Sequence, residues 1–188
     1  MSLLDVYVLG APILRQETKP VAAVDDGIRR LVDDMFETMY AARGIGIAAP
    51  QVGRRERVAV IDVQTKTSTP IAIINPEIVF REGTQRAEEG CLSIPEIYGD
   101  VDRAARVTVR ALDTSGQPFE IEADDILARC LQHEIDHLHG KLFIDYLGLI
   151  KRRAALAKWE RLRNGDKSPT RKIPPRDLAE HHTRDEEL

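Results

Sequence analysis

The sequence predicts a single domain with an α+β fold. Segments typical of β-strands gather before residue 124, and two helical segments follow them. Helices segregated from strands in this way indicate α+β rather than an alternating, parallel α/β fold. The length of 188 residues suits one domain of ordinary size that buries a substantial core.

An N-terminal helix and a Gly/Ala-rich segment precede the strands. In DDGIRRLVDDMFETMYAARG the apolar residues recur with helical spacing, at Ile28, Leu31, Val32, Met35, Phe36 and Met39. Asp25 and Asp26 suit the beginning of this helix, and Gly44 lies beyond its end. The following GIGIAAPQVG carries too little side chain for an ordinary helix.

Four apolar segments rich in β-branched residues are predicted strands. RVAVIDV and PIAIINPEIVF are separated by a polar turn near Thr65–Thr69. ARVTVRALD and QPFEIEA follow, and they form a predicted hairpin around the turn TSG.

Two helices complete the domain. The helix in DDILARCLQHEIDHLHG has Asp124 or Asp125 as its N-cap and ends at Gly140. A last helix covers roughly Tyr146–Arg163. The polar, proline-bearing sequence beyond it is typical of a flexible tail. We therefore expect one domain over residues 1–163 and a tail over residues 164–188.

The composition indicates a globular, soluble protein without a disulfide framework. Hydrophobic residues make up 43% of the sequence and charged residues 31%. It has no run of about 18 apolar residues, so we expect no membrane span. The start, MSLLDVYVLGAP, lacks a targeting signal, which predicts a cytoplasmic location. The net charge of -4 gives no general attraction to nucleic acid, so we expect no specific DNA partner.

His133, Glu134 and His137 form the pattern H-E-x-x-H within a predicted helix. Residues four apart share one helix face, so the two imidazoles can point at one metal ion. Glu134 lies one step around the helix, too far round to be a ligand but able to contact a water molecule on the metal. The pattern indicates a Lewis acid beside a general base. The alternative is an ordinary polar helix face that carries these letters by accident.

A catalytic site of this kind needs a third protein ligand. Cys130 shares the helix, but the metal would lie roughly 7.5 Å from it along the axis, at ~1.5 Å per residue. A thiolate reaches only roughly 5 Å from its Cα, so we expect Cys130 to be a small buried packing residue. Cys91 stands in the loop-like segment EEGCLSIPE. Alone it would favour a buried structural cysteine, but beside an incomplete histidine pair it favours a ligand.

Three segments, GIGIAAPQVG, EEGCLSIP and QHEIDHLHGKLF, closely resemble in order and spacing the three signature motifs of peptide deformylases. These enzymes remove formyl groups from the initiator methionine of new bacterial proteins. The likeness covers most of the chain before the tail. It implies antiparallel β-sheets packed around a central helix that carries HEIDH, with further helices near both ends.

The resemblance also assigns roles to the motif residues. It implies that the metal ligands are Cys91, His133 and His137, with Glu134 as the general acid/base. Hydrogen bonds to the oxyanion would come from the side chain of Gln51 and the backbone N–H of Leu92.

Substrate-binding residues follow from the same resemblance. A flexible apolar pocket for methionine would be lined by Ile45, Ile126, Cys130 and the stem of Arg129, although Arg129 could instead face solvent at the rim. An extended peptide would take main-chain hydrogen bonds from Gly44–Ile45 and Gly90. Gly44 and Gly46 lack a Cβ and would let the backbone approach the peptide closely; an ordinary turn after a helix is the alternative.

The implied cofactor is one Fe²⁺ per chain. Zn²⁺, Ni²⁺ or Co²⁺ could occupy the same site, because two imidazoles and a thiolate suit all of them. The implied substrates are N-formylmethionyl nascent peptides, and we expect a monomer. Two alternatives are an H-E-x-x-H metallopeptidase and a non-catalytic ribosome-binding metal module. Closed structural sites supply four ligands, which argues against the second.

The last predicted helix is strongly basic. Six Lys and Arg residues stand against two acidic ones between Asp145 and Arg163, a net charge of +4. The resemblance implies that this helix contacts the ribosome. The alternative is a solvated helix whose apolar residues pack on the core, namely Leu156, Trp159 and Leu162.

Overall fold

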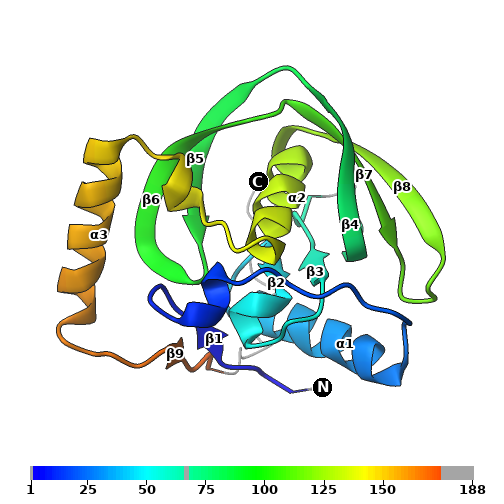
Figure 1. Cartoon of the computed structure of the whole chain (residues 1–188), viewed down its shortest axis with the longest axis horizontal. Helices are drawn as coiled ribbons and strands as arrows, with labels where there is room; N and C mark the ends of the chain where they lie inside the picture. Colours follow the sequence, from blue (N-terminus) through cyan, green and yellow to red (C-terminus); the bar gives the residue numbers. More distant parts are fainter. Residues whose placement is uncertain (1, 66–67, 175–188) are drawn as a thin grey trace, which may run out of the picture.

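The computed structural model describes residues 2–65 and 68–174, and it confirms the predicted α+β fold (Figure 1). Helix α2 (Asp125–Leu138) lies at the centre. A five-stranded antiparallel sheet packs on one side of it, in the order β2-β3-β4-β7-β8, and the hairpin β5–β6 lies on the other. The sheet contains β2 (Gly46–Ala48), β3 (Val58–Ile61), β4 (Ile71–Glu82), β7 (Arg106–Leu112) and β8 (Pro118–Asp124).

Two further helices flank this arrangement. Helix α1 (Asp26–Ala41) packs against β2 and β3, and its N-cap Asp25 accepts a hydrogen bond from the N–H of Ile28 at 2.9 Å. Helix α3 (Leu149–Arg163) lies on the outside of β6 (Figure 1). Short 3-10 helices form at Pro12–Arg15, Ala49–Val52 and Phe143–Tyr146. The last of these is separate from α3, which therefore begins later than the predicted Tyr146.

Helix α2 is held rigidly by its apolar residues. Leu131 and Leu138 are fully buried, and they share a core cluster with Ala59 and Ile61 of β3. A helix packed in this way on a sheet presents its remaining side chains in fixed directions. The side chains of the H-E-x-x-H pattern are therefore anchored by a well-packed scaffold.

The segment around Cys91 is a tight hairpin, not a loop. Strand β5 (Gln85–Cys91) ends at the cysteine and β6 (Ile94–Arg103) begins three residues later, with antiparallel pairing between them. No strand is predicted here from the sequence, because QRAEEGC lacks the apolar alternation that marks a strand. The hairpin fixes Cys91 more firmly than a loop would.

Part of the predicted tail is ordered. Strand β9 (Thr170–Arg171) pairs antiparallel with β1 (Val6–Tyr7), and Ile173 is buried in the core. The prediction of a flexible tail is therefore wrong for residues 164–174, and residues 175–188 lie outside the described residues. Residues 66–67 of the predicted polar turn also lie outside them. No helix among the described residues is long and apolar enough to cross a membrane.

Candidate metal centre

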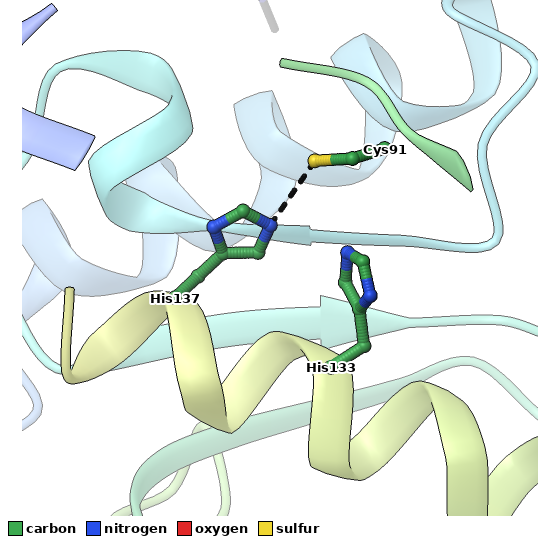
Figure 2. A group of neighbouring side chains, drawn as sticks. All are labelled: Cys91, His133 and His137. Carbon is green, nitrogen blue, oxygen red and sulfur yellow. Dashed lines mark hydrogen bonds between the residues drawn. The ribbon is translucent and has the colours of Figure 1, made fainter. Parts of the chain in front are cut away.

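Three ligand atoms converge between α2 and the turn of the β5–β6 hairpin (Figure 2). The Sγ atom of Cys91 and ring nitrogens of His133 and His137 all lie within 4.8 Å of one another. Cys91 Sγ is 3.2 Å from Nε2 of His137. A thiolate and two imidazoles around one point, three ligands in all, fit a divalent transition metal ion that keeps a position open for a reactant.

The orientation of His133 is set by a buried carboxylate that the sequence analysis missed. Nδ1 of His133 lies 2.9 Å from Oε2 of Glu89, and Glu89 is almost fully buried. A hydrogen bond from Nδ1–H to this carboxylate leaves Nε2 as the nitrogen that can bind a metal. Glu89 lies two residues before the ligand Cys91 in β5.

Two arginines hold Glu89 in place. Arg103 of β6 donates to both of its carboxylate oxygens, at 2.9 and 3.0 Å, and Arg129 of α2 donates to Oε1 at 2.7 Å. Arg103 also pairs with Asp136 of α2. Burial by itself opposes ionisation of Glu89, but the hydrogen bonds from His133 and Arg103 outweigh it and hold the pKa of Glu89 well below its ordinary value.

Glu134 lies in a dry environment beside the ligands. It is almost fully buried, and among the described residues its Oε2 has no hydrogen-bond partner. Burial raises the pKa of Glu134 to about 7, and the positive fields of His133 and Arg103 offset this only in part. A carboxyl group that titrates near neutrality can both accept and return a proton.

Gly46 makes room for Glu134. A Cβ at this position would lie 2.5 Å from Oε1 of Glu134 and 2.8 Å from Sγ of Cys130. Glycine therefore allows β2 to pack closely against α2. The sequence suggests another reason for this glycine, namely close approach of the backbone to a peptide. Cys130 is buried in the same core cluster as Leu131, which confirms its predicted packing role.

Gln51 is oriented from both ends of its side chain. Its Oε1 accepts a hydrogen bond from the N–H of Ala48 at 2.8 Å. Its Nε2 donates to Oγ of Ser93 at 3.2 Å and lies 3.6 Å from Sγ of Cys91. The amide N–H groups thus point toward the ligand cluster. Leu92 occupies the hairpin turn directly after Cys91.

The predicted substrate-binding residues fall into different environments. Arg129 is buried with its guanidinium bonded to Glu89 and to main-chain oxygens, so the alternative in which it faces solvent is wrong. Ile126 is 44% exposed at the start of α2. The thiol of Cys130 donates to the carbonyl oxygen of Ile45 at 3.5 Å, which places these two residues together. Gly90 pairs with Tyr98 across the hairpin.

The main-chain groups of Gly44 are used within the chain. Its N–H donates to the carbonyl oxygen of Met39 at 2.9 Å, and its own carbonyl accepts from Nε2 of Gln64 at 2.9 Å. The predicted main-chain hydrogen bonds from Gly44–Ile45 to a peptide stay a prediction, and a peptide that donated to the carbonyl of Gly44 would have to share it with Gln64. A Cβ at Gly44 would lie 2.8 Å from Cδ1 of Leu92, so the glycine leaves space for this leucine.

Comparison with known proteins identifies the family. The family model for polypeptide deformylase matches residues 3–153. The peptide deformylase of Alkalilimnicola ehrlichii is 55% identical over 163 residues, which cover 86% of this chain and 92% of that protein. The crystal structure of a peptide deformylase from Legionella pneumophila is 47% identical with a TM-score of 0.83, covering 87% of this chain and 96% of that one.

A structure of the Ehrlichia chaffeensis peptide deformylase in complex with actinonin is 40% identical with a TM-score of 0.83, covering 89% of this chain and 100% of that one. The chain belongs to the polypeptide deformylase family. It is therefore a hydrolase that removes formyl groups from polypeptides. Deformylases depend on a metal ion, and Cys91, His133 and His137 offer a possible site for one.

Sequence reasoning missed the three residues that support the deformylase ligands, namely Glu89, Arg103 and Asp136. A signal was present, because a metal-ligating histidine usually donates its second ring N–H to a carboxylate. The pair Glu88–Glu89, next to Cys91, offered candidates for that partner. The sequence alone could not distinguish the buried Glu89 from the exposed Glu88.

The contribution of Glu89 to metal binding and to stability can be measured. Glu89→Gln should weaken metal binding by about 10–100-fold, because the histidine loses the carboxylate that orients it. It should also lower the free energy of unfolding by about 3–5 kcal/mol, because two guanidinium groups lose a buried partner. Competition with a chelator and urea unfolding of the metal-free protein measure these effects. Glu88→Gln is the matched control, and equal behaviour of the two variants would contradict the assignment.

Proposed function

We propose that the chain hydrolyses the formyl group of N-formylmethionyl nascent peptides at a metal ion held by Cys91, His133 and His137. The observation that carries this proposal is the convergence of three ligand atoms within 4.8 Å beside the buried carboxyl group of Glu134. We propose Fe²⁺ as the resident ion, with Zn²⁺, Ni²⁺ or Co²⁺ able to occupy the same donors. One chain supplies all three ligands, which supports a monomer as the working unit.

A divalent ion at these ligands supplies a Lewis acid that polarises the formyl carbonyl and lowers the pKa of water. Glu134 carries the proton that the reaction moves from water to the amine. Its pKa of about 7 lets one carboxylate oxygen accept a proton from the attacking water at neutral pH. The same group later donates that proton to the departing amine, so Glu134 ends the reaction in its starting state.

The oxyanion that forms at the formyl oxygen requires fixed donors. Nε2 of Gln51 is suited to this role, because its partner Oε1 is tied to the N–H of Ala48 and the amide cannot rotate freely. We propose the backbone N–H of Leu92 as the second donor, since it follows the ligand Cys91 in the hairpin turn. Both groups are positioned before the substrate arrives.

The formyl carbon carries only hydrogen, so a crowded centre would favour formyl over acetyl groups. We propose that Ile45, Ile126 and Cys130 contribute to the methionine pocket. Formate release from formyl-Met-Ala-Ser, with metal analysis of anaerobically purified protein, tests the function. Cleavage of free-amine peptides without formate release would instead support the metallopeptidase alternative, and metal binding without either reaction would support the non-catalytic module.

The ligand set predicts contrasting behaviour of the two cysteines. Cys91→Ser should lose the bound metal and all activity, because a hydroxyl is a much weaker ligand than a thiolate. Cys130→Ala should keep a full metal complement, because its thiol donates to the carbonyl oxygen of Ile45 and packs in the core, and it is not among the described ligand atoms that converge. Metal content per chain, measured by elemental analysis, decides between them. A stoichiometric metal content in Cys91→Ser would refute the ligand assignment.

The proton transfer predicts a different result for Glu134→Gln. This variant keeps the shape of the side chain but cannot accept a proton, so the metal should stay while kcat falls by about 10²–10⁴-fold. Steady-state formate release and metal content measure the two quantities. A loss of less than about tenfold, with metal retained, would show that another group is the base.

We also propose that the enzyme works in the cytoplasm beside the ribosome, because its substrate exists only on newly made chains. The exposed helix α3 supports this proposal (Figure 1). Of the three apolar residues in the packing alternative, Trp159 is buried, whereas Leu156 and Leu162 are 36% and 43% exposed. Within the described part of the chain, no ion pair engages Arg153 or Arg161, and both are exposed.

Ribosome binding should depend on these two arginines. Arg153→Glu combined with Arg161→Glu should weaken cosedimentation with ribosomes at low salt, because phosphate contacts are electrostatic. Activity on formyl-Met-Ala-Ser should stay near that of the unmodified chain. Arg30→Glu combined with Lys141→Glu makes the same change of charge at exposed positions elsewhere. Equal cosedimentation of the two double variants would leave α3 without a ribosomal role.

A further inference from the structure

The 3-10 helix Phe143–Tyr146 follows α2 and packs against strands β5 and β6 (Figure 1). Asp145 anchors this short helix through ion pairs with Arg15 and with Arg152 of α3. Residues three apart on a 3-10 helix lie on the same side of it. Phe143 and Tyr146 can therefore present two aromatic rings to the same region of the protein.

Phe143 packs on a metal ligand. Its side chain is fully buried, and its ring stacks on the imidazole of His133, with the ring centroids 6.4 Å apart and an angle of 21° between the planes. Nδ1 of the same imidazole lies 2.9 Å from Oε2 of Glu89. The imidazole is thus held by a ring against its face and by a carboxylate at its edge.

Tyr146 packs on the guanidinium that holds this carboxylate. Cζ of Arg103 lies 4.6 Å from the centroid of the Tyr146 ring, which is within the range of a cation–π interaction. Arg103 donates to both oxygens of Glu89 and pairs with Asp136. Carboxylates therefore occupy the edges of the guanidinium, and an aromatic ring lies over its face.

The phenol of Tyr146 is neutral at working pH. Burial and the negative charge of Asp136 raise the pKa of Tyr146 to about 12, although Arg103 acts in the opposite direction. A neutral ring adds no net charge to the pair of Arg103 and Asp136, and the negative face of its π system attracts the guanidinium.

The ring also covers Arg103 beside a hollow in the surface. Arg103, Asp136 and Tyr146 all line a cavity of about 600 Å³, yet the side chain of Arg103 is only 4% exposed. Water that reached the guanidinium would weaken its attraction to Glu89, because a high dielectric reduces the energy between charges. A ring at this place keeps the hydrogen bonds from Arg103 to Glu89 strong.

We propose that Tyr146 is a positioning residue for the metal centre, which holds Arg103 against Glu89 and, through that carboxylate, fixes the orientation of His133. The inference rests on the ligand set in the proposed function. Because Tyr146 acts through Arg103 and Glu89, its effect should appear in the metal affinity and should depend on the carboxylate of Glu89.

Tyr146→Leu and Tyr146→Phe separate the aromatic ring from the hydroxyl group. Leucine keeps an apolar side chain but has no π face, so the metal affinity should fall by about three- to tenfold, less than the loss of the carboxylate itself causes. Phenylalanine keeps the ring and should bind the metal as the unmodified chain does. Competition between the protein and a chelator for Co²⁺ measures the affinity, and the visible spectrum of bound Co²⁺ reports the ligand geometry.

Phe80→Leu is the matched control. Phe80 on β4 is 51% exposed, similar to Tyr146 at 44%, and it is not among the described residues that line the cavity beside Arg103. This variant should keep the metal affinity of the unmodified chain. Equal affinities of Tyr146→Leu and Phe80→Leu would overturn the inference, and so would an equal loss in Tyr146→Leu and Tyr146→Phe.

A double variant tests the route through Glu89. Tyr146→Leu combined with Glu89→Gln should bind the metal as Glu89→Gln alone does, because residues that act through one another are not additive. An additive loss would overturn the inference. If the double variant does not fold, the comparison of Tyr146→Leu with Tyr146→Phe and Phe80→Leu decides. An unmodified chain that binds no metal would instead refute the proposed ligand set itself.

Discussion

A single buried carboxylate, that of Glu89, ties the metal helix to the hairpin that carries the third ligand. It accepts hydrogen bonds from Arg103 of β6 and from Arg129 and His133 of α2. A charge removed from water has to be matched by partners, so hairpin and helix cannot separate without leaving an ion unpaired. Asp136 also pairs with Arg103. The charges of the two carboxylates, Glu89 and Asp136, thus balance those of the two guanidinium groups. The histidine orientation and the packing of the two elements thus depend on the same interactions.

The partners that each carboxylate meets explain why the pKa of Glu134 differs so much from that of Glu89. Glu89 meets two guanidinium groups and keeps its charge, whereas Glu134 lies beside Gly46 and its Oε2 has no hydrogen-bond partner among the described residues. Burial is the largest cause and raises the pKa of Glu134 to about 7, while the charges of His133 and Arg103 lower it and those of Glu89 and Asp136 raise it. Two carboxylates in one small site therefore acquire different protonation behaviour from their surroundings alone, one as a permanent anion and one as a proton carrier.

A feature can be predicted from the sequence when the residues that determine it lie close together along the chain. His133, Glu134 and His137 are placed by one helix, whose geometry is local and regular, and the structure brings the two histidines together as expected. Arg129 shows the opposite case. The charge of Arg129 is visible in the sequence, but its partner Glu89 is 40 residues away. The sequence therefore predicts only that Arg129 lines the methionine pocket or faces solvent at its rim. The β5 segment QRAEEGC, which contains Glu89, carries no apolar alternation that would predict a strand.

The C-terminal segment shows that contacts between distant residues also determine where the folded unit ends. A two-residue strand such as β9 has no sequence signature, because it exists only through its pairing with β1 at the other end of the chain. The N-terminal segment in turn bonds the hairpin turn through Leu9 and Ser93. Cys91 is therefore positioned through contacts that involve both ends of the chain, whereas the spacing of the two histidines comes from α2 and the orientation of His133 from Glu89. A boundary at residue 163 would cut through the outermost of these segments, so the structural unit extends at least to the buried Ile173.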